Sequence, residues 1–157
     1  MTASHRLSVT RRIAASPARL FAAWTDPAQL RAWWGPADVR CTHAEVDARV
    51  GGRYRLENVL DDASVIVITG EFLLVDPPNE LVYTWEVQPG PANLEQVTVR
   101  FLARGAETEV SILHERIESE EIRDRHTAGW WGCLDGLATH VGSSAATRRL
   151  LRRPDRT

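Results

Sequence analysis

Apolar residues stand at every second position over much of the chain, which is the pattern of strands that bury one face. Residues 7–13 alternate in this way, and further β-rich runs occupy residues 39–48, 53–60, 65–74, 81–87, 96–103 and 108–115. Short segments rich in Gly, Pro, Asp and Asn separate the later runs, so we expect consecutive strands to pair antiparallel. The pattern predicts seven strands in one antiparallel sheet.

Two short stretches between the first and second runs have helical spacing instead. Ser16 followed by Pro17 is a typical N-cap and first-turn pair. Asp26 and Pro27 repeat that arrangement, and a Gly-Pro pair ends the second stretch. We therefore expect two short helices between strands one and two.

The last part of the chain changes period and predicts one long helix over residues 118–151. Acidic residues near its start and arginines near its end both suit the helix dipole. Only this helix is long enough to cover the apolar face of the sheet. The predicted fold class is α+β, with the seven-stranded sheet curved around the helix and a ligand cavity between them. The apolar stripe that should face the sheet consists of Trp130, Cys133, Leu134, Leu137 and Val141.

Length and charge fit one domain and exclude several classes of protein. The 157 residues carry 19 basic and 21 acidic side chains, a net charge of −2, whereas nucleic-acid-binding domains are usually strongly basic. The sequence has neither a run of about 18 apolar residues nor a signal-peptide core. We expect a single cytoplasmic domain over residues 1–157, with no nucleic-acid partner and no membrane insertion. Its core should span about residues 7–145, and residues 146–157 form an Arg-rich tail.

Sequence motifs for catalysis and metal binding are missing. The five histidines form neither an HExxH motif nor a His/Cys cluster, and no GxSxG nucleophile elbow occurs. Cys41 falls in a strand and Cys133 on the apolar helix stripe, where a thiol is usually an inert small hydrophobe. We therefore assign no catalytic residue, no metal site and no cofactor.

Three glycines, Gly129, Gly132 and Gly136, lie on one flank of the predicted long helix. Each of them weakens a helix by roughly 1 kcal/mol relative to Ala, so the group needs an explanation. Two interpretations stay open: close approach of the helix to its neighbours, or room for a ligand or a lid.

Candidate ligand-binding residues come from the faces that should point into the cavity. On the long helix, Arg123 and His126 lie within about 40° of Trp130 at 3.6 residues per turn. On the strands, His114 continues the apolar face of the last run, and Asn58 continues that of residues 53–60. For each polar group a structural role, a hydrogen bond to backbone or extension to the rim, stays open. For the aromatic residues a plain core role stays open beside a pocket role. The full candidate set is Tyr54, Leu56, Asn58, Phe72, Tyr83, Trp85, Phe101, Ile112, His114, Arg123, His126, Trp130 and Leu134.

Several motifs taken together resemble one protein family. The chain is similar to the SRPBCC (START/Bet v-like) superfamily, and within it to bacterial proteins that resemble the C-terminal domain of the activator of heat-shock protein 90 ATPase. The resemblance covers about residues 7–141. The motifs are SPARLFAAWTDP (16–27), LRAWWGP (30–36), DARVGGRY (47–54), GEF (70–72), VDPP (75–78), ELVYTW (80–85), TEV (108–110) and HTAGWWGCL (126–134).

The resemblance implies a helix-grip fold with a hydrophobic tunnel and no obligatory metal or cofactor, but it does not imply one activity. The leading hypothesis is non-enzymatic binding of a small hydrophobic molecule, aromatic or lipid-like, in the internal cavity. One alternative is a cyclase or hydrolase that uses His114, His126 and Arg123 for acid–base and oxyanion chemistry. Another is a chaperone-regulating or stress-response interaction module. Members of this class are often monomeric or dimeric, so a homodimer is among the expectations.

Overall fold

The computed structural model describes residues 4–36, 38–90 and 93–152, with backbone alone for residues 143–152. The predicted Arg-rich tail, residues 146–157, therefore lies outside the described residues apart from a helical backbone as far as Arg152. The elements are β1 (His5–Ile13), α1 (Pro17–Thr25), α2 (Pro27–Trp33), β2 (Val39–Val46), β3 (Arg53–Leu60), β4 (Val65–Asp76), β5 (Glu80–Gln88), β6 (Glu95–Arg104), β7 (Glu107–Ile117) and α3 (Glu120–Arg152).

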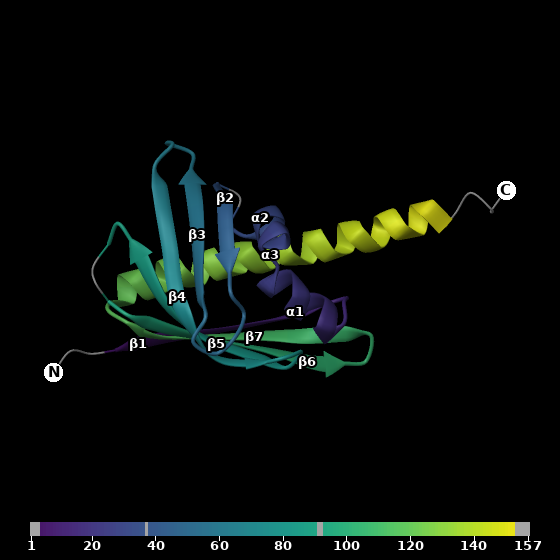
Figure 1. Cartoon of the computed structure of the whole chain (residues 1–157), viewed down its shortest axis with the longest axis horizontal. Coiled ribbons are helices and arrows are strands. Elements are labelled where there is room, and N and C mark those ends of the chain that lie inside the picture. Colours follow the sequence, from purple (N-terminus) through teal and green to yellow (C-terminus); the bar gives the residue numbers. More distant parts are fainter. Residues whose placement is uncertain (1–3, 37, 91–92, 153–157) are drawn as a thin grey trace.

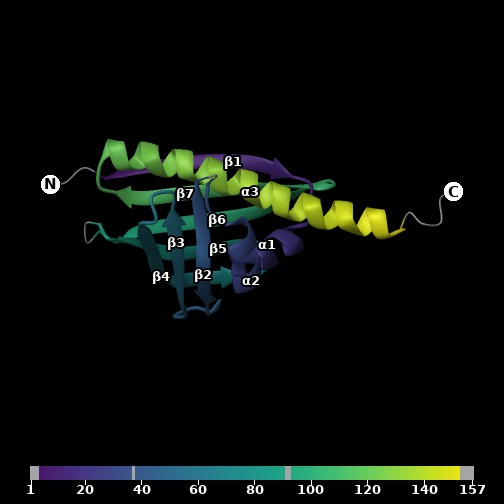
Figure 2. The same ribbon diagram turned by 90° about the horizontal axis from the view of Figure 1, so that it is seen from above.

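The seven strands form one antiparallel sheet in the order β1-β7-β6-β5-β4-β3-β2. In Figure 1 the strands β2 and β3 stand steeply to β6 and β7, so the sheet is strongly curved. The long helix α3 runs along the inside of this curve, and α1 and α2 lie beside it (Figures 1 and 2). The predicted α+β class, with two short helices after the first strand, is confirmed.

Local sequence signals explain where the short helices begin. The Ser16 side chain accepts a hydrogen bond from the backbone N–H of Arg19 at 3.1 Å, as an N-cap does. The Asp26 side chain accepts from the N–H of Ala28 at 3.1 Å and caps α2. The long helix starts two residues later than predicted, because the Ser119 hydroxyl accepts from the N–H of Ile122 at 3.2 Å and caps it there.

The predicted stripe of α3 is the part of the helix that enters the core. Trp130, Leu134, Leu137 and Val141 are each at most 4% exposed. Opposite them lie the inner faces of the central strands, where alternate residues are fully or almost fully buried. Among the described residues, no helix is both long and apolar enough to cross a membrane.

The three glycines on one flank of α3 have different surroundings. A Cβ on Gly132 would lie 2.5 Å from the Cβ of Pro36, and one on Gly136 would lie 2.5 Å from the carbonyl oxygen of Trp33. These two glycines let the helix approach the chain that follows α2. A Cβ on Gly129 would meet no atom within 4 Å. Close approach therefore explains Gly132 and Gly136 but not Gly129.

Candidate functional site

A cavity of about 210 Å³ lies between the first half of α3, the strands β3 to β5 and the segment after α2. Its wall is mostly apolar and includes Trp85 and Trp130, and Gly129 opens part of it on the helix side. The polar side chains that line it are Asn58, Arg125 and His126. The structure thus has a mainly hydrophobic chamber with a few polar groups on its wall.

Two side chains that line this cavity each carry a buried polar atom without a protein partner among the described residues. The Asn58 side chain donates from Nδ2 to the carbonyl oxygens of Leu56 and Ile66, both at 3.3 Å. These two acceptors fix the orientation of the amide, so Oδ1 is the atom without a partner. The indole N–H of Trp85 is the second such atom. Asn58 is 2% exposed and Trp85 is 7% exposed, so the protein shields both groups from bulk water.

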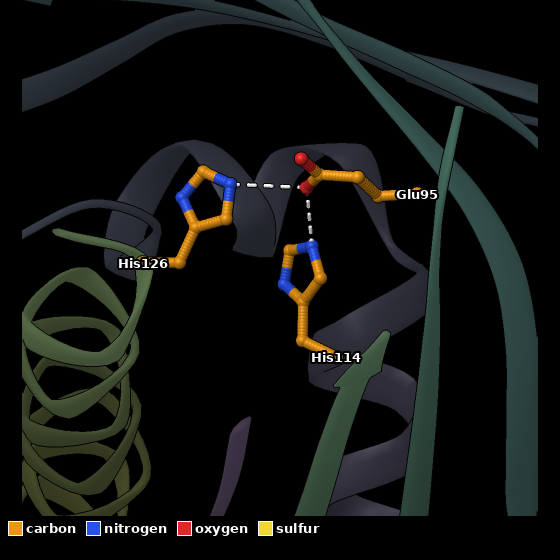
Figure 3. A group of neighbouring side chains, drawn as sticks. All are labelled: Glu95, His114 and His126. Carbon is orange, nitrogen blue, oxygen red and sulfur yellow. Dashed lines mark hydrogen bonds and ion pairs between the residues drawn. The ribbon is translucent and has the colours of Figure 1, made fainter. Parts of the chain in front are cut away.

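Beside the cavity, three side chains from β6, β7 and α3 meet at one carboxylate oxygen (Figure 3). Oε1 of Glu95 lies 2.6 Å from Nε2 of His114 and 3.0 Å from Nε2 of His126. The two imidazole rings are stacked, with centroids 4.7 Å apart. Glu95 and His114 are buried, whereas His126 keeps 19% of its side chain exposed and lines the cavity. Because a carboxylate can only accept, both rings donate their Nε2 protons to Glu95.

Trp130 fixes the protonation of the inner histidine. Its indole N–H, which can only donate, lies 3.0 Å from Nδ1 of His114, so that nitrogen carries a lone pair. Burial lowers the pKa of His114 below its ordinary value of 6.5, although the hydrogen bond to Glu95 opposes this shift. Burial alone would raise the pKa of Glu95, but the hydrogen bonds from the two histidines outweigh it and lower the pKa to about 2. At neutral pH the cluster therefore contains an ionised carboxylate and a neutral His114.

The same three residues have the ligand types of a metal site, and their ligand atoms lie within 4.8 Å of one another. A metal ion on Nε2 of His114 would require the proton of that ring to move to Nδ1. There it would face the N–H of Trp130 and break that hydrogen bond. Metal-binding histidines normally donate a hydrogen bond from their second nitrogen, whereas this nitrogen accepts one. The chemistry of the donor set therefore does not fit a metal.

Apart from Arg123, the structure divides the sequence-predicted candidates into three groups. Asn58, Trp85, His126 and Trp130 line the main cavity, and His114 lies behind it in the cluster. A second cavity, of about 20 Å³, is lined by Tyr54, Leu56, Phe72, Tyr83 and also Trp85. Phe101, Ile112 and Leu134 are at most 3% exposed and belong to the solid core, lining neither of these two cavities.

Arg123 lies elsewhere, at the surface of α3. Its guanidinium group pairs with Glu120 at 3.2 Å and with Asp124 at 3.3 Å, and it does not line either of the two cavities described above. The helical angle that brought Arg123 into the candidate set takes no account of position along the helix axis. Arg123 precedes Trp130 by seven residues, or about 10 Å of helix, which takes it past the end of the cavity.

Within the cluster, Glu95 is the residue that the sequence interpretation missed, and the cavity-lining Arg125 was also absent from the candidate set. The signal was present, since Glu95 continues the inward face of Val97, Val99 and Phe101 at the same period of two. An acidic residue beside a turn rich in Gly and Pro favoured a strand that begins at residue 96. The strand begins at Glu95 because two imidazole N–H groups satisfy its buried carboxylate.

Comparisons with known proteins agree on one family. The family model described as Activator of Hsp90 ATPase homolog 1-like protein matches residues 14–142. A solved structure from Chromobacterium violaceum has 26% identity and a TM-score of 0.80, and the match covers 85% of this chain and 94% of that one. The AHSA1 protein from Silicibacter pomeroyi has 24% identity and a TM-score of 0.80, with 89% and 99% covered. An uncharacterised protein from Rhizobium leguminosarum has 20% identity and a TM-score of 0.79, with 91% and 97% covered. No curated protein matches the sequence significantly.

The family match extends from the end of β1 to the buried part of α3, so it includes every element that forms the cavity and the Glu95 cluster. The solved structures share the curved sheet and the long helix. The resemblance to the SRPBCC superfamily is confirmed, and this chain belongs to the family of Activator of Hsp90 ATPase homolog 1-like proteins.

Proposed function

We propose that this protein binds a small, mainly apolar molecule in the cavity between α3 and the sheet. The size of the cavity supports this. A dry cavity of about 150 Å³ is enough to bind a benzene ring in another protein. A chamber of about 210 Å³ therefore has room for one substituted ring or a short acyl chain, but not for a large polycyclic ligand.

The main support for the proposal is that two residues lining an apolar cavity each carry an unpartnered polar atom. A buried donor or acceptor without a partner costs about 1–3 kcal/mol, so native proteins rarely keep one. Here Oδ1 of Asn58 and the N–H of Trp85 are buried atoms of two side chains that line the same cavity, within reach of a small rotation of either side chain. A ligand with an apolar body and a few polar atoms would bury the wall and supply both hydrogen bonds.

The comparisons support this function only at the level of the family. Membership in this superfamily favours a hydrophobic ligand, and the C. violaceum and S. pomeroyi proteins share the fold. The identity of the ligand has to come from the cavity itself. Its limited volume and its indole walls favour a single aromatic ring over a long lipid chain.

The proposal is tested with 4-nitroanisole, a single-ring probe whose nitro group quenches tryptophan emission. Trp34, Trp85 and Trp130 line the cavity, so binding should quench the fluorescence of the protein in a saturable way. The test variant is Gly129→Leu, which places a side chain in the open space of the cavity wall. The matched control is Gly142→Leu, the same change in the same helix at an exposed position with open space around it.

We expect the wild type and Gly142→Leu to bind the probe alike, and Gly129→Leu to bind at least about tenfold more weakly. Native mass spectrometry of freshly purified protein then looks for a retained ligand that Gly129→Leu loses. Saturable binding that is equal in all three proteins would place the probe outside the cavity. Such a result, or a complete lack of binding by the wild type, contradicts the proposal.

A further inference from the structure

The arrangement around His126 sets which of its nitrogens is free. Its Nε2 lies 3.0 Å from Oε1 of Glu95 and donates to it, so in the neutral ring the lone pair is on Nδ1. Among the described residues, no hydrogen bond reaches that second nitrogen. Figure 3 shows it on the side of the ring that points away from Glu95. His126 is also one of the residues that line the cavity, and part of its side chain is exposed.

His114 cannot serve as this acceptor, although it is the more buried histidine. Its Nε2–H is used by Glu95 at 2.6 Å, and its Nδ1 accepts from Trp130 at 3.0 Å. It is 0% exposed and does not line the cavity. Its role is positional, because together with Trp130 it holds the carboxylate of Glu95 in place behind His126.

A carboxylate behind an imidazole is the arrangement that general acid–base sites use. The carboxylate fixes the tautomer of the ring and stabilises the imidazolium that forms when the other nitrogen takes up a proton. Other charged and polar groups face the same space. Arg125 lines the cavity, with its guanidinium group paired to Glu121 at 3.1 Å. Trp85 contributes an unpartnered N–H that can hold a negatively charged oxygen.

We infer that His126 is the proton acceptor of this cavity and that its ligands are apolar ring compounds with a weakly acidic hydroxyl, as in phenols and enols. This inference rests on the proposed function, and it adds the chemical class of the ligand. In the proton transfer from the ligand to His126, the O–H bond of the ligand breaks and its electron pair stays on the oxygen. The proton forms an N–H bond at Nδ1 of His126, and the resulting imidazolium remains hydrogen-bonded to Glu95.

Two matched probes distinguish the contribution of the hydroxyl group to binding from that of the ring. 4-Nitrophenol and 4-nitroanisole share the ring and the nitro group, but only the phenol has a proton to give. We expect the wild type to bind the phenol roughly tenfold more tightly than the ether, since one buried hydrogen bond is added. We also expect the pKa of the bound phenol to lie roughly one unit below that of the free phenol. The absorption band of the phenolate should therefore appear at a correspondingly lower pH in the complex.

Three variants assign the effect to the cluster. His126→Gln keeps a polar side chain but removes the basic nitrogen, so it should bind both probes equally and lose the phenolate band. Glu95→Gln removes the charge behind the ring, so it should weaken the band and lower the thermal midpoint, while unchanged binding of the ether shows that the cavity is intact. Arg123→Gln is the control, because it removes a surface charge of the same helix outside the cavity. It should behave like the wild type.

The outcomes distinguish this inference from the function on which it rests. If the wild type binds neither probe, the proposed binding function fails. If the wild type binds both probes with equal affinity and the phenol stays neutral, the cavity binds rings but His126 is not its proton acceptor. A phenolate band that persists in His126→Gln would assign the effect to Arg125 or Trp85 and overturn the inference.

Discussion

Adding one methyl group at Gly129, Gly132 or Gly136 of α3 probes how closely this helix packs against the end of α2 and the chain that follows it. In Gly132→Ala, the new Cβ would lie 2.5 Å from the Cβ of Pro36, where ordinary contact begins at 3.4 Å. The neighbours must therefore move by about 0.9 Å. In Gly129→Ala, the new Cβ meets nothing within 4 Å. The two changes are chemically identical and lie one turn apart on one helix.

The expected magnitudes follow from two opposing effects. Replacing a glycine inside a helix by alanine stabilises it by about 1 kcal/mol. Overpacking of a tight contact costs about 1–3 kcal/mol. Gly129→Ala should therefore raise the free energy of unfolding by about 1 kcal/mol, while Gly132→Ala should lower it by about 1 kcal/mol. For a domain of this size each kcal/mol corresponds to about 2–4 °C in the thermal midpoint.

Circular dichroism during thermal and urea unfolding measures both variants, with Gly136→Ala as a second tight position next to the carbonyl of Trp33. The order of stability should be Gly129→Ala first, then the wild type, then the other two variants. Equal shifts for Gly129→Ala and Gly132→Ala would refute the close packing of α3 against Pro36.

Three further predictions concern the cluster and the core. Because the pKa of His114 lies below 6.5 and that of Glu95 is about 2 instead of 4.5, the unfolded chain binds more protons in both windows. The free energy of unfolding should therefore fall as the pH drops below about 6.5, where His114 contributes, and fall again below about 4.5, where Glu95 contributes. The loss due to Glu95 should be on the order of 3 kcal/mol. Urea midpoints that stay constant from pH 7 to pH 3 would contradict this prediction. Trp130→Phe removes the N–H that occupies Nδ1 of His114 and should cost about 1–3 kcal/mol, while NMR titration should show a raised His114 pKa; an unchanged pKa would argue against the assigned tautomer. Leu134→Ala, at a fully buried position of α3, should lower the free energy of unfolding by about 2–5 kcal/mol in urea titrations, and a loss below about 1 kcal/mol would speak against the packing of this helix in the core.

Much of the fold could be predicted because its signals are local. The alternation in residues 53–60 predicted a strand with the same bounds as β3, and Ser16 and Asp26 marked the starts of both short helices. The ends of some elements were predicted less accurately than their positions. The strand β4 runs two residues beyond its predicted end, to Asp76, and the start of α3 depends on the cap at Ser119.

The candidate site was predictable only in part. Periodicity placed Asn58 and His114 on inward faces, and both are at most 2% exposed. The meeting of Glu95 with His126, 31 residues away, depends on how β6, β7 and α3 pack together. The register that pairs Val97 with His114 is part of that arrangement, and no local pattern encodes it. The hydrophobic pattern also gives no reason to bury a carboxylate, because a buried charge is costly without hydrogen-bonding partners. The two histidines that supply these hydrogen bonds are seen only in the folded structure.

A crystal structure of the protein with 4-bromophenol would show whether this cavity binds a ring compound, because the anomalous signal of bromine locates the ring without ambiguity. We expect bromine inside the cavity beside Trp85 and Trp130, with the hydroxyl oxygen within hydrogen-bond distance of His126, Trp85 or Asn58. Bromine found only on the outer surface, with the cavity filled by rearranged side chains, would contradict the claim that this chamber is a ligand-binding site.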